Sequence, residues 1–228
     1  MQFQDSENFT IDGKRTTVHE SDQFTWLTIM DSHGAKMTEF LGRQGSNAVV
    51  ISGGGTSEAD RFMAEKQIMS KPYNGIFIFL GGNDISKGMP PAQLEQRLRM
   101  MTHQIAISNP ECVIVTGTII PRADRPDKGD QFVRRCEEVD KMITKAAPHH
   151  HHMLNDAMVR EPTRKGGPVG VREELYGPDM VHLNMDGLCM LQTIYHFVFA
   201  SVNRNQYDQR VELKGQDSQS FRSALFKF

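Results

Sequence analysis

The stretch FTWLTIMDSHGAKM, residues 24–37, decides the fold, because an apolar run stops abruptly at Asp31-Ser32-His33. Residues 24–30 are apolar throughout rather than at alternate positions, which is typical of a strand buried between two layers of helices. In an open parallel sheet the ligand crevice lies beyond the carboxyl ends of the strands. A serine between an acid and a histidine therefore stands where such a sheet assembles a site.

Segments of strand length and segments of helix length alternate along the chain. The further apolar runs are AVVIS (48–52), GIFIFLGG (75–82) and CVIVTGTII (112–120), and we expect a fifth, shorter strand over HHMLND (151–156). Helix-like segments, with apolar side chains three or four positions apart, lie at 57–70, 91–108, 130–147 and 184–201. Alternating strands and helices form parallel sheets through right-handed crossovers. We therefore expect an α/β fold in which a mainly parallel five-stranded sheet is covered by helices on both faces.

The two ends of the chain differ from this central part. Within residues 9–18, Asp12-Gly13 lies between strand-like flanks and indicates a short hairpin. The last residues, FRSALFKF, follow a polar stretch, and we expect their apolar side chains to dock on the protein's own core. We divide the chain into an N-terminal extension (1–23), a main domain (24–202) and a C-terminal tail (203–228).

The composition is that of an ordinary globular protein. The 228 residues are 38% hydrophobic and 24% charged, with a formal net charge of −2. This length suits one substantial core, and no run reaches the roughly 18 apolar residues that span a bilayer. Three scattered cysteines without CxxC spacing favour a reducing compartment, and the N-terminal residues do not resemble a secretory signal. We therefore expect a cytoplasmic protein without general attraction to nucleic acid.

Polar segments follow the first three predicted strands, and another precedes the last helix. They are DSH (31–33), SGGGTS (52–57), GGNDIS (81–86) and DMVH (179–182). A serine hydroxyl becomes nucleophilic when an imidazole accepts its proton and a carboxylate holds the other ring nitrogen, roles that fit Ser32, His182 and Asp179. Donors for an oxyanion are available from the Ser32 N–H, a glycine N–H within 53–55, and the Asn83 amide. These residue types suit acyl transfer.

In order, these segments resemble the four sequence blocks of the SGNH or GDSL-type hydrolases. DSH resembles the nucleophile block, GGGT (53–56) the second block, LGGNDIS (80–86) the third, and DMVHLNMDG (179–187) the block that contains DxxH. The family comprises esterases, lipases, thioesterases and carbohydrate deacetylases with a flavodoxin-like, three-layer α/β/α fold. The resemblance implies Ser32 as nucleophile, His182 as general base and Asp179 as its orienting acid, with Ser32, Gly54 and Asn83 in the oxyanion hole.

The resemblance also implies a serine esterase that needs no metal or cofactor and hydrolyses an acyl or acetyl ester of a small molecule, lipid or carbohydrate. Met30 departs from the family, which usually has glycine before the Asp-Ser pair, and we expect its side chain to reshape the turn or narrow the pocket. His33 is not assigned as the base, because an adjacent ring seldom reaches back to its neighbour's hydroxyl. We expect loops 119–130 and 157–181 to set the pocket shape.

Several of these features also fit roles without catalysis. Ser32 alone fits a helix cap, and Asp179 with His182 fits a capping arrangement. The four histidines at 149–152 are interpreted as a solvated turn rather than a metal site. The GGGTS segment (53–57) lacks the lysine of a phosphate-binding loop, which also disfavours a flavodoxin-like cofactor binder.

The main alternative to an enzyme is a module of the same fold with weak or no catalytic activity that binds RNA or protein. Its contact surface would be the basic loop 160–172 or the C-terminal tail. The presence of all the block residues favours the enzyme.

Overall fold

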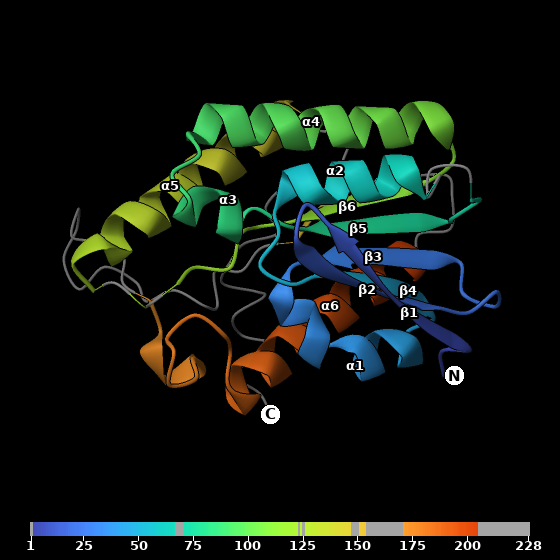
Figure 1. Ribbon diagram of the computed structural model, residues 1–228, viewed down its shortest axis with the longest axis horizontal. Helices are drawn as coiled ribbons and strands as arrows, with labels where there is room; N and C mark the ends of the chain where they lie inside the picture. The colour runs from blue at the N-terminus through green and yellow to red at the C-terminus, as the bar shows by residue number, and fades with distance from the viewer. Residues whose placement is uncertain are drawn as a thin grey trace.

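The computed structural model describes residues 2–66, 71–122, 124, 126–146, 151–153 and 171–204. These residues form one seven-stranded sheet with strand order β1-β2-β4-β3-β5-β6-β7 (Figure 1). The strands are β1 (Asp5–Ile11), β2 (Lys14–Glu20), β3 (Trp26–Met30), β4 (Ser46–Ile51), β5 (Gly75–Phe79), β6 (Val113–Gly117) and β7 (His151–Met153).

Strands β3 to β7 are parallel and are the five strands that the sequence predicts. Every residue of β3, β4 and β5 is buried, which explains why these runs are apolar at consecutive positions. Successive side chains of β3 enter opposite cores: Leu27 and Ile29 pack on one face, Trp26 and Met30 on the other.

The prediction of five strands is wrong, because the N-terminal hairpin joins the same sheet. β1 pairs antiparallel with β2, and β2 pairs antiparallel with β4. Asp12 and Gly13, the predicted hairpin turn, both have positive φ, as the central residues of a tight type I′ turn require. The hairpin extends the sheet at the edge that β4 would otherwise leave open.

Helices cover both faces of the sheet, as the sequence predicts. Their bounds are η1 (Ser32–Lys36), α1 (Thr38–Arg43), α2 (Thr56–Glu65), α3 (Gly82–Ser86), α4 (Pro91–Ser108), α5 (Pro126–Ala146), η4 (Glu173–Leu175) and α6 (Met185–Arg204). Helices α2, α4 and α5 share one core with the sheet, and α1 and α6 share the other (Figure 1). Helix α5 begins four residues earlier than predicted, at Pro126, because proline is favoured in the first turn of a helix.

The strand order fixes where a site can form. The chain passes from β3 to its neighbour β4 on one side, and later returns to β5 on the other side of β3. Loops that leave neighbouring strands in opposite directions open a crevice at the carboxyl end of the central strand. Ser32 lies at that end of β3.

Several predictions fall on residues outside the described ranges. These include the core of the basic loop (160–170), His149 and His150, and the tail beyond 204. Among the described residues, no helix is long and apolar enough to cross a membrane, and no three metal-binding side chains converge. Nothing in that part of the chain supports an RNA or protein partner.

Candidate active site

Ser32 is held directly beyond the carboxyl end of β3 by the residue before it. Asp31 is the N-cap of η1, and its carboxylate accepts a hydrogen bond from the His33 backbone N–H at 3.1 Å. A capping carboxylate fixes the point where a helical turn begins. The turn therefore presents the Ser32 hydroxyl at the edge of the sheet.

Two residues from the loop before α6 continue a chain of hydrogen bonds that begins at this serine. Ser32 Oγ lies 2.9 Å from His182 Nε2, and His182 Nδ1 lies 2.6 Å from Asp179 Oδ2. Ser32 and His182 are 150 positions apart in the chain. The structure thus brings together the three residues that the sequence proposes as nucleophile, base and orienting acid.

Asp179 is held as an anion beside the ring. Hydrogen bonds from the His182 ring and from the backbone N–H groups of His182 and Val181 keep the pKa of the Asp179 carboxyl well below its ordinary value. The side chain is 52% exposed, so solvent screens its charge. A carboxylate here keeps the hydrogen of a neutral imidazole on Nδ1, which leaves Nε2 free to accept a proton from Ser32.

Two of the three residues proposed as oxyanion donors, Asn83 and Gly54, are linked by a hydrogen bond. The Asn83 side chain, in α3, donates a hydrogen bond from Nδ2 to the Gly54 carbonyl at 2.8 Å. An amide nitrogen carries two hydrogens, so this bond leaves one for another acceptor. The Gly54 N–H donates to the Ile51 carbonyl at 3.3 Å, a long bond that a better acceptor can replace. The Ser32 N–H lies in the first turn of η1, where backbone donors have no acceptor within the helix.

A buried carboxylate positions the glycine turn against α3. Asp84 accepts hydrogen bonds from the Thr56 backbone N–H at 3.0 Å and from the Thr56 hydroxyl at 3.1 Å. Burial raises the pKa of Asp84, although these two bonds oppose the effect. A Cβ on Gly55 would run into the same carboxylate, so the turn can approach only with glycine there. Because Asp84 follows Asn83, it fixes the turn relative to the amide.

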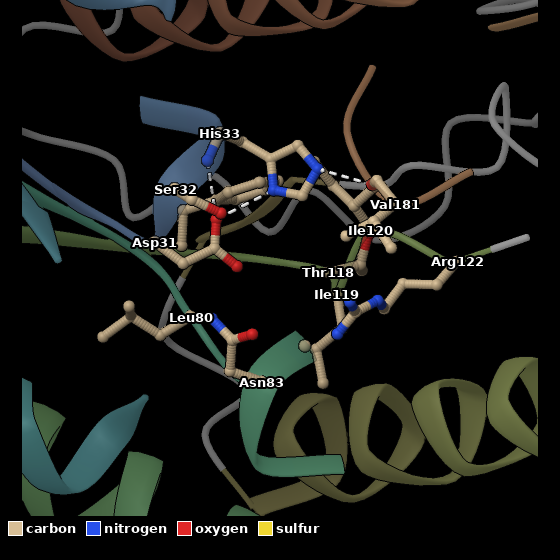
Figure 2. A pocket seen from close by; sticks show the side chains of 12 residues that line it. Asp31, Ser32, His33, Leu80, Asn83, Thr118, Ile119, Ile120, Arg122 and Val181 are labelled. Atoms are coloured by element: carbon tan, nitrogen blue, oxygen red, sulfur yellow. Dashed lines mark hydrogen bonds and ion pairs between the residues drawn. The ribbon is translucent and has the colours of Figure 1, made fainter. Parts of the chain in front are cut away.

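A hollow opens beside Ser32, between β3, α3 and the loop after β6 (Figure 2). Leu80, Ile119 and Ile120 supply apolar lining, while Asn83 and Arg122 supply polar groups. Arg122 Nη1 donates to Ser86 Oγ at 2.8 Å, which ties that loop to α3. The sequence predicts that the loop 119–130 shapes the pocket, but it does not single out Arg122. Its position shortly after a predicted strand is the signal that could have found it.

Met30 does not line this hollow. Its side chain is fully buried in the core that the sheet shares with α1 and α6. A Cβ on Gly34 would lie 2.8 Å from the Met30 Cβ, so the glycine in η1 makes room for the methionine. The expectation that Met30 narrows the pocket is therefore not met, because its strand position directs the side chain into the core.

Comparison with known families identifies the chain. A model of the GDSL-like lipase/acylhydrolase family matches residues 15–188, a range that contains all four sequence blocks. The chain belongs to this family. No curated protein matches it.

Several solved structures share the fold. A GDSL-like lipase from Bacteroides thetaiotaomicron is 14% identical and superposes with a TM-score of 0.63 over 80% of this chain and 91% of its own. An acetyl xylan esterase, AlAXEase, is 14% identical, with a TM-score of 0.57 over 76% of this chain and 98% of its own. TesA is 18% identical, with a TM-score of 0.50 over 78% and 98%. At these identities the similarity establishes the three-layer α/β fold alone and leaves the substrate open.

Proposed function

We propose that this protein is a serine esterase that hydrolyses an acyl or acetyl ester. Ser32 Oγ attacks the carbonyl carbon, and its proton passes to His182 Nε2. The proton then goes to the leaving alkoxide, which departs as an alcohol and leaves an acyl group on Ser32. Water, deprotonated by His182, then attacks the acyl carbonyl. The bond between the acyl carbon and Ser32 Oγ breaks, His182 returns the proton to Ser32 Oγ, and the acid is released.

The observation that carries this proposal is the hydrogen-bonded chain from Ser32 through His182 to Asp179. His182 Nε2 lies 2.9 Å from the Ser32 hydroxyl oxygen, and the Asp179 carboxylate lies 2.6 Å from the opposite ring nitrogen. Capping alone does not require the imidazole to meet the serine. This series of hydrogen bonds therefore favours Ser32 as a nucleophile over Ser32 as a helix cap.

The negative charge that develops on the carbonyl oxygen of the substrate is stabilised by hydrogen-bond donors that lie beside Ser32 and point at this oxygen. We propose the Ser32 N–H, the Gly54 N–H and the Asn83 amide for this role. Removing one such donor in a hydrolase costs about 3 kcal/mol of transition-state stabilisation. The apolar lining of the hollow supports an acyl group as the part of the substrate that lies beside Asn83.

Labelling and turnover test the proposal together. The full-length protein is expected to hydrolyse p-nitrophenyl acetate and to react at Ser32 with a fluorophosphonate probe. Ser32→Ala is expected to lose both properties, whereas Ser108→Ala, an exposed serine at the end of α4, is expected to keep them. A folded wild-type protein that shows neither turnover nor labelling would exclude the esterase.

A further inference from the structure

His33 lies between the turn that carries Ser32 and the loop that carries His182. The residue is buried, with its Nδ1 2.8 Å from Asp31 Oδ1 and its Nε2 3.2 Å from the Val181 carbonyl oxygen (Figure 2). The ring also packs against the His182 ring, with centroids 5.4 Å apart. His33 therefore links the two segments whose relative position sets the contact between Ser32 and His182.

Both ring nitrogens of His33 face oxygens that accept hydrogen bonds. An ionised carboxylate and a backbone carbonyl have no hydrogen to donate, and a neutral imidazole carries a hydrogen on only one of its nitrogens. A neutral ring can thus make the bond to Asp31 or the bond to Val181, but not both. The imidazolium makes both.

We propose that His33 is a positioning residue which, as an imidazolium, ties Val181 and the adjoining His182 to the turn that presents Ser32. The inference deepens the proposed esterase function and rests on it. His33 touches none of the reacting atoms and acts through the geometry of His182. Misplacement of a reacting group by about 1 Å costs about 100-fold in rate, so a link of this kind has a measurable effect.

The charges and hydrogen bonds around His33 and Asp31 favour a protonated His33 beside an ionised Asp31. Burial alone would lower the pKa of His33, but the charge of Asp31 and the two hydrogen bonds raise it above its ordinary value, against an opposing charge from Arg122. Burial alone would raise the pKa of Asp31, but His33, with a smaller contribution from His182, lowers it overall. Tyr195, from α6, lies near Asp31, and burial raises its pKa so that it stays neutral.

Nitrogen-15 NMR of the histidine-labelled, full-length protein tests the proton without reference to activity. At neutral pH, both ring nitrogens of His33 are expected to carry hydrogens, with the signals assigned by their loss in His33→Asn. A neutral ring with a single protonated nitrogen would overturn the proposal. This measurement remains informative even if the protein fails to hydrolyse esters.

Two substitutions of His33 distinguish its contact with Val181 from its contact with Asp31. The His33→Gln amide can reach the position of Nε2 and donate to Val181, whereas the His33→Asn amide can reach only the position of Nδ1. We expect His33→Asn to lower kcat for p-nitrophenyl acetate by about 10- to 100-fold with little change in KM. His33→Gln is expected to lose less of the wild-type kcat. It is also expected to lack the fall in kcat that deprotonation of His33 causes in the wild type as the pH rises through the raised pKa of His33.

His103→Asn, an exposed histidine on α4, is the matched control and is expected to behave as the wild type. Circular dichroism and urea unfolding establish that each variant is folded. If His33→Asn and His33→Gln both kept the wild-type kcat and pH profile, His33 would have no positioning role. An inactive wild type without Ser32 labelling would instead count against the esterase function itself.

Discussion

Asp179 holds both the ring and the backbone of His182. Its Oδ2 lies 2.6 Å from His182 Nδ1, and its Oδ1 accepts the backbone N–H groups of His182 at 2.9 Å and Val181 at 3.0 Å. The three-residue spacing of the DxxH segment makes this arrangement local. Contacts within its own loop therefore orient the imidazole that contacts Ser32, and this orientation does not depend on the sheet.

Replacing Asp179 by asparagine separates orientation from charge. In Asp179→Asn the amide oxygen can still accept the two backbone N–H groups, while the NH₂ group faces His182 Nδ1. Because the amide NH₂ is a donor, the His182 ring would carry its hydrogen on Nε2 and use Nδ1 as the acceptor. A protonated Nε2 cannot accept the proton of Ser32. We expect kcat for p-nitrophenyl acetate to fall by about 10³- to 10⁴-fold while the fold is retained.

Asp186→Asn is the matched control for this change, because Asp186 is an exposed acid in the first turn of α6. It is expected to keep the wild-type kcat. If Asp179→Asn were nearly as active as this control, the carboxylate would not orient the base.

The contribution of the Asp31–His33 pair to stability is expected to depend on pH. His33 has a raised pKa in the folded protein, so its contribution is complete below the ordinary value of 6.5 and is lost as the pH rises through the raised pKa. Asp31 has a lowered pKa, so its contribution is complete above the ordinary value of 3.8 and is lost as the pH falls through the lowered pKa. The pair therefore stabilises the fold most between these two values.

Urea unfolding of the wild type and His33→Gln at several pH values measures this contribution. The difference between their free energies of unfolding is expected to be largest at about pH 5 and to shrink as the pH rises through the raised pKa of His33. A difference that grew with pH would show that His33 is neutral in the folded protein.

Much of the site could be predicted from the sequence because it depends on where strands end. Ser32 and the segment 81–86 follow adjacent parallel strands, whose carboxyl ends meet at the same edge of the sheet. The place of His182 was predictable from the DxxH segment, although its contact with Ser32 is a long-range one. Local chemistry, sheet topology and the resemblance of four segments to a known family were together sufficient for these residues.

Contacts that depend on side-chain direction could not be predicted in this way. The sequence does not show that the His33 ring reaches Val181, or that Arg122 turns back to Ser86, because both contacts cross between loops of unknown path. The sheet has seven strands rather than five because the N-terminal hairpin pairs with β4 and so joins the sheet. The Asp12-Gly13 pair identifies a hairpin turn but not the strand with which the hairpin pairs.

Two buried tyrosines are expected to respond in opposite ways to the loss of a hydroxyl group. Tyr195 packs among aromatic rings beneath the site, and its buried hydroxyl has no hydrogen-bond partner among the described residues. The Tyr176 hydroxyl, also buried, donates to the Pro121 carbonyl at 2.5 Å.

A buried polar group without a partner costs about 1–3 kcal/mol, whereas a buried hydrogen bond contributes about 1 kcal/mol. Tyr195→Phe should therefore raise the free energy of unfolding by about 1 kcal/mol, and Tyr176→Phe should lower it by a similar amount. Urea unfolding of both variants beside the wild type measures the two changes, and a loss of stability in Tyr195→Phe would mean that its hydroxyl makes a favourable interaction.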